Sequence, residues 1–326
     1  MNFKTVFFYV IRLLCFFVLT SDSLFSQPKI ETSNLHIDYK NKAIIYSDLG
    51  YSSAPFTIQF NTQKENIKLA YKNNIQPFIG VGFIYKFISL HYTHLLPIHI
   101  KSIDRYGSNK YFNINFDYTN KNIYSDIGYS QYQGFGIKNT ENLISGKNQI
   151  YNELKSKSFY LNSWYFGNKE FKIASLKGIR SVVDKELFSW YLKGTFNVFN
   201  LKNPVPILPD EYTLSEATIN TSYALQGIDI GLVPGLAYVK RINEWQCGAL
   251  GGFGGVLQEK GYKSVKANRY FVGLAPRYDL KIMVGYTLHN LFTMLHFEID
   301  NKTIRFNEYK YNQSYYTIRI IGGYRF

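Results

Sequence analysis

The last stretch of the chain, residues 314–326, alternates strictly between two kinds of side chain. One set of alternate residues includes Ile318, Ile320, Tyr324 and Phe326, and the other set includes Arg319 and Arg325. Side chains of a β-strand point alternately to opposite faces, so one face is apolar with aromatic ends and the other carries two arginines. This pattern is typical of a membrane-spanning β-strand with aromatic girdles and a polar lumen.

Residues 1–26 have the features of a secretory signal peptide. Lys4 gives a basic start, an apolar region broken by Arg12 follows, and a small polar stretch ends at Ser26. We expect cleavage after Ser26 or Ser23, and a periplasmic segment at 27–50. A retained anchor helix is the alternative, but the apolar region is too short and too interrupted to span a membrane comfortably.

Beyond residue 27 the chain has no candidate for a membrane-spanning helix. The longest apolar run, 231–239, contains Pro234 and reaches only half of the roughly 20 residues required. A chain of this kind that enters a membrane must form a closed barrel, because open sheet edges cannot be satisfied in lipid. The 29 Tyr and 26 Phe residues favour strands.

Further segments repeat the alternation, at 78–85, 88–94, 111–118, 123–130, 187–199, 228–240, 244–257, 270–286 and 291–299. The segment 171–183 is read as another strand, although its alternation is ambiguous because neither of its faces is free of charge. The segments 56–60 and 67–71 alternate as well, and the pattern does not decide which of them belongs to the barrel. The predicted connections are short at 86–87, 119–121, 184–185, 241–243 and 288–290. They are long at 97–109, 135–170, 200–226, 258–268 and 301–313.

Outer-membrane barrels have short periplasmic turns and long external loops, whereas a soluble sandwich has no reason to alternate in this way. We therefore predict an all-β fold, a single antiparallel transmembrane β-barrel over residues 51–326 in a bacterial outer membrane. The strand number is about twelve, within a range of ten to fourteen. A soluble periplasmic β-sandwich is the alternative.

Inward-facing charges are the main functional hint. Seven candidates fall on predicted lumen faces, namely Lys193, Asp279, Lys281, Glu298, Asp300, Arg319 and Arg325. Such mixed charges either line an aqueous pore or pair with one another and fill a closed barrel. The leading hypothesis is a channel for small solutes. The alternatives are an outer-membrane lipid hydrolase and a structural or adhesion barrel without transport activity.

A hydrolase would use His91 as a base, since Ser89 and His91 share one predicted lumen face. No Gly-x-Ser-x-Gly motif accompanies them, so we assign no catalytic residue and expect no enzyme. A metal site from His91, His94 and His99 fails because these spacings scatter the rings over both faces of a strand. We expect no metal and no cofactor. The glycines of 248–255 lack the ending of a phosphate loop and more simply permit bending or the approach of an interior plug.

The formal net charge of +14 indicates an anionic partner. An exported chain rarely meets nucleic acid, so we expect outer-membrane lipid, including anionic glycolipid. The sequence does not indicate an oligomeric state.

Several stretches resemble an uncharacterised outer-membrane barrel family, domain of unknown function 4421. They are AYKNN at 70–74, IGVGFIYK at 79–86, KELFSWY at 185–191 and VPGLAY at 233–238. The resemblance extends from about residue 40 to the end and rests on strand patterns. It implies a fold and a location, without a known activity or site residues.

The terminal segment resembles the signal that the barrel-insertion machinery reads during biogenesis. Tyr324 and Phe326 match its aromatic positions, whereas Ile321 stands where the glycine is expected and Gly322 and Gly323 follow. The resemblance implies this machinery as a partner.

Overall fold

The computed structural model describes residues 36–39, 41–61, 65–74, 76–98, 103–139, 141, 143, 146, 149–184, 186–213, 218–288, 290–307 and 309–326. The predicted signal peptide at 1–26 lies outside these ranges. Within them nearly every element is a β-strand, as the alternation predicts. Among the described residues, none of the helices is long and apolar enough to cross a membrane.

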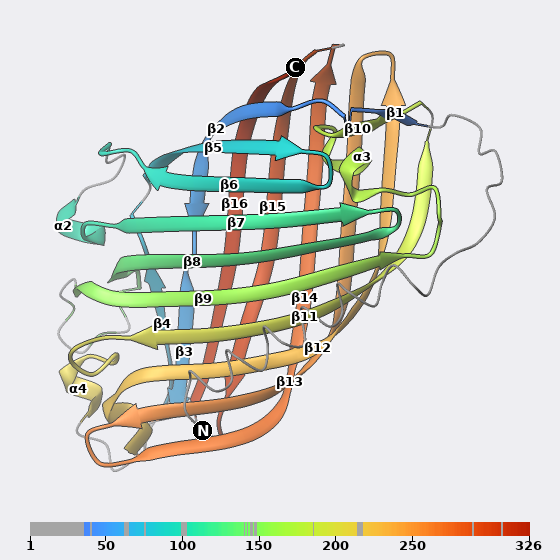
Figure 1. The fold of residues 1–326 in the computed structure, drawn as a ribbon. Coiled ribbons are helices and arrows are strands. Elements are labelled where there is room, and N and C mark those ends of the chain that lie inside the picture. Colours follow the sequence, from blue (N-terminus) through green and yellow to red (C-terminus); the bar gives the residue numbers. More distant parts are fainter. Residues whose placement is uncertain are drawn as a thin grey trace. The chain divides into compact units, whose positions relative to one another are not determined.

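Twelve antiparallel strands of the described chain pair into a closed ring (Figure 1). The C-terminal strand closes it, because β16 pairs with β15 on one side and with β2, the first strand of the ring, on the other. In ring order the strands are β2 (Ile44–Ser53), β5 (Pro77–Tyr85), β6 (Ile88–Leu95), β7 (Lys110–Asn120), β8 (Ile123–Ile137), β9 (Ile150–Phe166), β11 (Leu187–Lys202), β12 (Ser222–Ile242), β13 (Trp245–Ser264), β14 (Asn268–Thr287), β15 (Leu291–Arg305) and β16 (Tyr309–Arg325). The prediction of a single antiparallel barrel of this size is confirmed.

The two ends of the barrel differ in their connections. At the short-turn end, tight turns join β5 to β6, β7 to β8, β12 to β13 and β14 to β15, and the C-terminus lies beside them (Figure 1). The loop end carries the longer connections 54–76, 96–109, 138–149 and 203–221, which include the short helices α2 (Ile103–Tyr106), α4 (Asp210–Thr213) and η2 (Thr218–Thr221).

The barrel begins earlier than the predicted boundary at residue 51. β2 starts at Ile44, inside the segment 27–50 that we expected to precede the barrel. Neither of the segments left open, 56–60 and 67–71, belongs to the ring. They form the hairpin β3 (Phe56–Asn61) and β4 (Asn66–Lys72), which bridges the loop-end parts of β16 and β8. Ile44 and Tyr46 are apolar but face inward, and Ser47 is polar but faces outward, so the alternation expected of a membrane strand did not reveal β2.

The second correction concerns residues 135–186. The predicted loop 135–170 is wrong, because β9 spans Ile150–Phe166 and pairs along its length with β8 and β11. The predicted strand 171–183 and short connection 184–185 are also wrong. This segment contains the helix α3 (Ile173–Lys177) and the short strand β10 (Ser181–Val183), which pairs with β1 (His36–Asp38). We call residues 167–186, which join β9 to β11 at the short-turn end, the plug.

Three other predicted loops are shorter than expected. The connection predicted at 200–226 covers only 203–221, and those at 258–268 and 301–313 shrink to 265–267 and 306–308. The strands flanking them continue beyond the apolar segments by which they were recognised. Strands that extend past the membrane are solvated on the outside, so they lose the apolar alternation that marks the spanning part.

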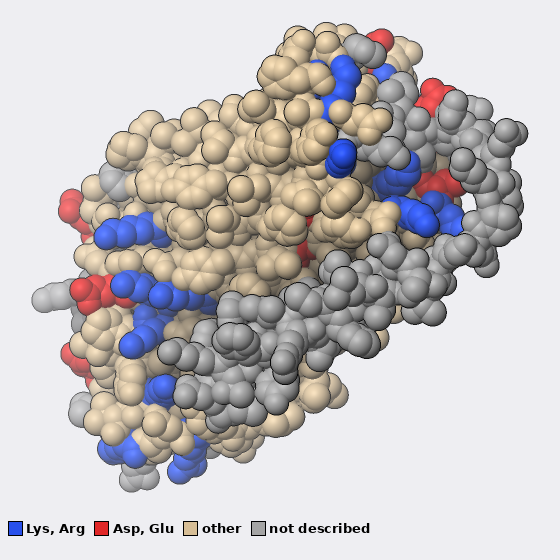
Figure 2. Space-filling view, viewed as in Figure 1, with Lys and Arg blue, Asp and Glu red and all other residues tan. Residues whose placement is uncertain are grey.

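Outward-facing side chains of the ring form an apolar belt. Aromatic residues mark its margin at the short-turn end, where Trp190 and Trp245 are more than half exposed. On the face that Figure 2 shows, Lys and Arg gather towards the two ends of the described surface and leave a broad band between them. An apolar band flanked by aromatic girdles is the lipid-facing surface of a membrane barrel.

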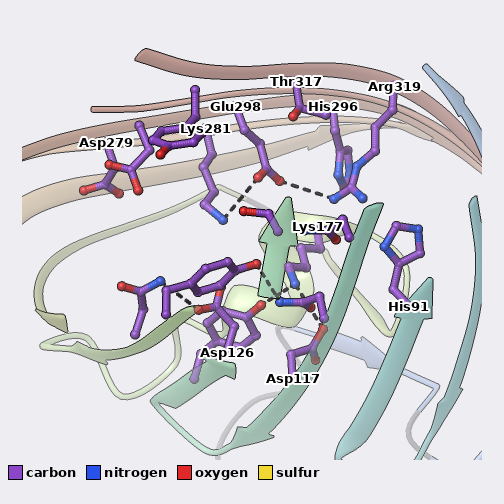
Figure 3. A pocket seen from close by; sticks show the side chains of 18 of the residues that line it. His91, Asp117, Asp126, Lys177, Asp279, Lys281, His296, Glu298, Thr317 and Arg319 are labelled. Atoms are coloured by element: carbon purple, nitrogen blue, oxygen red, sulfur yellow. Dashed lines mark hydrogen bonds and ion pairs between the residues drawn. The ribbon is translucent and has the colours of Figure 1, made fainter. Parts of the chain in front are cut away.

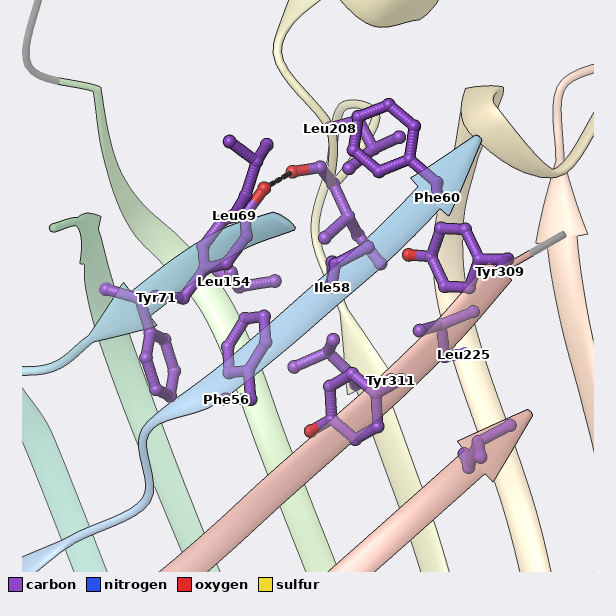
Figure 4. Packing of buried hydrophobic residues seen from close by; sticks show 14 of the residues in the cluster. Phe56, Ile58, Phe60, Leu69, Tyr71, Leu154, Leu208, Leu225, Tyr309 and Tyr311 are labelled. Carbon is purple, nitrogen blue, oxygen red and sulfur yellow. Dashed lines mark hydrogen bonds between the residues drawn. The ribbon is translucent and has the colours of Figure 1, made fainter. Parts of the chain in front are cut away.

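The loop end of the barrel is filled by buried apolar side chains, which we call the loop-end cluster (Figure 4). Its members come from the hairpin β3–β4, the loop 203–221 and the loop-end parts of several ring strands, and include Phe56, Ile58, Phe60, Leu69, Tyr71, Leu208, Leu225, Tyr309 and Tyr311. The Tyr71 hydroxyl donates to the carbonyl oxygen of Ile207 at 2.8 Å, which ties the loop to the hairpin.

Candidate functional site

The barrel interior encloses a polar cavity of about 210 Å³, which we call the chamber. Plug residues, among them Lys177 and Arg180, line it towards the short-turn end. Tyr111, Tyr132 and Tyr315, which belong to the loop-end cluster or pack against it, line it towards the other end. The chamber therefore lies between two barriers inside the ring.

The structure places six of the seven predicted lumen residues in the lining of the chamber. These six are Lys193, Asp279, Lys281, Glu298, Asp300 and Arg319. Arg325, the seventh, also points inward but contacts the plug. The lining contains both signs of charge, and most of the charged groups are paired with one another.

A continuous network of ion pairs begins on one wall of the chamber with Lys281, Glu298 and Arg319 (Figure 3) and continues behind it through Asp48 to His91. Glu298 lies between two cations, 3.5 Å from Lys281 Nζ and 3.4 Å from Arg319 Nη2. Arg319 Nη1 lies 3.3 Å from Asp48 Oδ2, which in turn lies 3.0 Å from His91 Nε2. Antiparallel pairing brings these inward-facing side chains together from neighbouring strands.

Asp48 is the member of this ion-pair network that the sequence pattern did not identify. It lies on β2, which the apolar pattern did not reveal, and its side chain is fully buried. The residue itself is the signal that could have revealed the site. A carboxylate that a strand directs into a barrel is removed from water and therefore needs a cation beside it. His91 was identified as a lumen residue, and its ring stacks on Tyr46 with centroids 5.7 Å apart.

Two lysines share one aromatic ring deeper in the chamber. Trp164 is 1% exposed, and its ring centroid lies 5.0 Å from Lys193 Nζ and 5.4 Å from Lys281 Nζ. Lys193 also pairs with Asp279 Oδ1 at 3.7 Å. Cation–π contacts of this kind hold ammonium groups where water is scarce.

The plug is attached to the wall by two cations. Arg180 Nη2 and Lys177 Nζ donate to the two carboxylate oxygens of Asp117 at 3.3 and 3.4 Å. Lys177 Nζ also donates to the Tyr124 hydroxyl at 2.5 Å. Burial lowers the pKa of Lys177, and the nearby Asp117 carboxylate opposes this shift.

Arg325 at the end of β16 is the principal contact between the ring and the plug. Its Nε donates to the carbonyl oxygen of Ile179 at 2.8 Å and its Nη2 to that of Gly178 at 2.9 Å. Gly178 adopts a φ of 67°, a left-handed conformation that ends α3 and leaves these carbonyls free to accept. The guanidinium also lies over the rings of Tyr39 and Phe292, and the residue is fully buried.

β13 supplies further plug contacts. Gln246 accepts a hydrogen bond from the Val183 backbone at 3.1 Å and donates to the carbonyl oxygen of Ser175. At Gly248 an added Cβ would come within 3.1 Å of Leu176 Cγ, so this glycine lets α3 approach the wall. The contacts of the plug with the ring are noncovalent and include both these polar contacts and apolar ones, such as that of Ile179 with a buried cluster of ring side chains.

Comparison with known families gives one match. Residues 36–326 match the family described as Domain of unknown function (DUF4421). The chain belongs to this family. The resemblance found in the strand patterns at 70–86, 185–191 and 233–238 is therefore confirmed, and DUF4421 covers the ring, the plug and the loop-end hairpin together.

No curated protein sequence matches this DUF4421 chain. Similar solved structures include the outer-membrane protease OmpT of Escherichia coli, at 10% identity and a TM-score of 0.41, covering 91% of this chain and 99% of that one. The Pseudomonas putida toluene transporter TodX has 7% identity and a TM-score of 0.30, covering 87% and 90%. The β domain of the Bordetella autotransporter BrkA has 10% identity and a TM-score of 0.34, covering 87% and 99%. Likenesses at this level carry no argument about activity.

Among the described residues of the DUF4421 chain, no group of three or more His, Cys, Asp or Glu side chains is arranged to hold a metal ion. Cys247 is exposed on the outside of β13. The chemistry that the site offers is therefore that of a charged, enclosed chamber.

Proposed function

We propose that this protein is a gated conduit for small polar solutes in a bacterial outer membrane. The observation that carries the proposal is the chamber itself, a polar cavity inside a closed ring that one noncovalently attached segment separates from the short-turn end. Displacement of the plug would open the chamber to that side without breaking the ring, and passage to the outside also requires the side chains of the loop-end cluster to move apart. The short-turn end then faces the periplasm and the loop end faces outward.

The charge pattern of the chamber predicts its selectivity. Lys281, Glu298, Arg319 and Asp48 alternate in sign along one wall, so their fields largely cancel at a distance. A lumen dominated by one sign would instead favour the opposite ion strongly. We therefore expect weak discrimination between cations and anions, with solute size as the main limit.

The surroundings of the barrel complete the proposal. The chain carries a net charge of +14, and basic side chains gather beyond the apolar belt (Figure 2). Such residues suit the phosphate groups of an anionic outer-leaflet glycolipid. We propose this lipid as a partner and the barrel-insertion machinery, reading Tyr324 and Phe326, as a second partner during assembly.

Two other functions fit the site less well. A hydrolase would need a nucleophile beside the Asp48–His91 pair, yet among the described residues no serine hydroxyl hydrogen-bonds His91. We propose no catalytic step for it. A purely structural barrel would account for the loop-end cluster, but would not require a charged chamber beneath it.

Conductance in planar bilayers tests the proposal. The wild-type protein would be compared with a variant in which residues 168–185 are replaced by a short Gly-Ser linker. We expect rare, small current steps from the wild type and more frequent steps from the variant, because only the loop-end cluster then still has to open. Folding of both would be verified by heat-modifiable migration in detergent gels. If the folded variant passes no more current than a protein-free bilayer, the proposed passage is wrong.

A further inference from the structure

The ladder between β14 and β15 ends halfway along the two strands. Its last pair is Asp279 with Asp300, although β14 continues to Asn268 and stays paired with β13 along that length. In the described structure, β14 therefore has no strand partner on its other edge over residues 268–278. We call the line between this edge and the loop-end part of β15 the seam. Backbone groups at such an edge cannot be satisfied by lipid.

Side chains replace the missing ladder at the seam. The backbone carbonyl oxygens of three alternate residues of β15 accept hydrogen bonds from side chains. Asn301 accepts from Arg277, Thr303 from Gln258 and Arg305 from Lys260. These donors belong to β13 and β14. The seam is thus closed by polar side chains rather than by a backbone ladder, and two of them, Arg277 and Gln258, are also bonded to the buried carboxylate of Asp229.

Asn301 acts as a substitute for the next pair of the ladder. Its side-chain oxygen accepts from the Tyr278 backbone N–H at 2.7 Å, and its side-chain nitrogen donates to the Pro276 carbonyl oxygen at 3.4 Å. Pro276 has no N–H group, so it cannot continue a regular ladder here. The carboxamide of Asn301 therefore holds the two strands together where their pairing stops.

The seam lies at the outer margin of the apolar belt. Strand pairing places Leu274 of β14 in one row with Leu257 of β13 and Ile230 of β12, all of which point outward. Leu274 is 81% exposed and Val272 is 71% exposed. Apolar side chains this exposed at this level face lipid.

The chamber extends to the seam from the inside. Its lining includes the inward-facing Arg277, Asp279 and Asp300, and also Tyr278 and Ile299, which alternate with them and belong to the outer face. The seam is thus charged on its inner side and apolar on its outer side. A molecule within it would need a polar head and an apolar tail.

We propose that the seam is a lateral passage between the chamber and the outer leaflet for a single-chain amphiphile with an anionic head. Lys302, which lines the chamber and contacts Ser158 and the rings of Phe199 and Tyr315, receives the head, and the tail leaves past Leu274 and Ile299. This inference deepens the proposed function, because it identifies the outer exit of a chamber whose loop end is filled by the loop-end cluster.

Trp164 reports entry into the chamber. Trp190→Phe and Trp245→Phe leave it as the single tryptophan, since the chain has 3. Protein in liposomes would receive a bromine-labelled fatty acid, whose bromine atoms quench tryptophan only at short range. A two-chain phospholipid with the same bromine label serves as the reference for quenching through the wall.

Asn301→Ala should open the seam. We expect Trp164 quenching by the fatty acid to become about tenfold faster, the change that corresponds to one hydrogen bond's net contribution. Quenching by the two-chain lipid should not change. Asn197→Ala is the matched control, because Asn197 is a buried amide that bonds Ser158 between fully paired strands. Equal rates for wild type and Asn301→Ala, or an equal acceleration by Asn197→Ala, would overturn the proposal.

The outcome is independent of the conductance experiment. Fast quenching with no ionic current would keep the lateral passage and remove the passage of polar solutes. Current through the plug-replaced variant without entry of the fatty acid would remove the lateral passage alone.

Discussion

Arg325 Nε lies 2.8 Å from the carbonyl oxygen of Ile179, so the last strand of the ring binds the segment that closes the short-turn end. The two arginines of β16 thus have different partners. Arg319 meets the carboxylates of Asp48 and Glu298, whereas Arg325 meets backbone carbonyls of the plug. One strand closes the ring, pairs the chamber charges and holds the plug.

Removal of the Arg325 side chain should loosen the plug. Arg325→Met deletes hydrogen bonds to Gly178, Ile179 and Leu288, and leaves buried carbonyls without donors, at a cost of about 2–4 kcal/mol in plug docking. We expect more frequent channel opening in planar bilayers with an intact barrel. Arg241→Met is the control, because Arg241 lies at the same end and its side chain donates to the carbonyl oxygen of Asn243 in its own turn. Equal opening frequencies for the two variants would contradict this role.

The docked plug should respond to alkaline pH through Lys177. Burial lowers its pKa below the ordinary 10.5, whereas a displaced plug regains the ordinary value. The docked state then binds fewer protons, so docking becomes more favourable as pH rises from the lowered pKa to 10.5. We expect opening to become rarer across this window. Lys177→Met should abolish the dependence, and an increase of opening with pH in the wild type would show that the sign is wrong.

Arg319 should matter for the stability of the ring. Arg319→Met leaves the buried Asp48 and Glu298 with an unbalanced negative charge, which costs roughly 3–5 kcal/mol for a broken buried pair. Urea unfolding in liposomes measures the change. The matched pair Lys240–Glu186 is exposed, so Lys240→Met should leave the midpoint unchanged. A shift of the same size in both variants would exclude a specific role for the chamber network.

Cys247 provides a test of which face meets lipid. It is the one free cysteine of the described chain and lies on the outer face of β13, two residues from Trp245. In liposomes we expect slow reaction with a charged, membrane-impermeant maleimide and fast reaction after unfolding in detergent and urea. Rapid labelling of the folded protein in liposomes would place this part of β13 in water.

The alternation of side chains was enough to predict the barrel, its closing strand and its inward charges. In β16, Ile318, Ile320 and Tyr324 are exposed and Arg325 is buried, as the pattern of 314–326 requires. That pattern depends only on the period of a strand and on the difference between lipid and lumen. It holds wherever a strand stays within the membrane.

The pattern failed where another influence determined the side chains. β9 carries the outward charges Glu153, Lys155 and Lys157, because its loop-end half extends beyond the lipid. In β2 the inward-facing Ile44 and Tyr46 are apolar, because they pack in a buried cluster that includes Ile179 of the plug. The plug looks like a strand because Phe171, Ile173, Leu176 and Val183 are apolar, yet they are buried inside the barrel. The ring strands β2 and β9 were missed, whereas the segment 171–183 and one of the segments 56–60 and 67–71 were counted. The predicted number of about twelve strands was therefore right, although two of its members were not.

A disulfide between the plug and β13 tests the gating account most directly. Because a Cβ at position 248 would lie 3.1 Å from Leu176 Cγ, Leu176→Cys with Gly248→Cys has the geometry of a disulfide, in a Cys247→Ser background. We expect no current through the barrel while the bridge is oxidised, and current in the same bilayer after a reductant is added. Equal current before and after reduction, with the bridge verified by mass spectrometry, would contradict it.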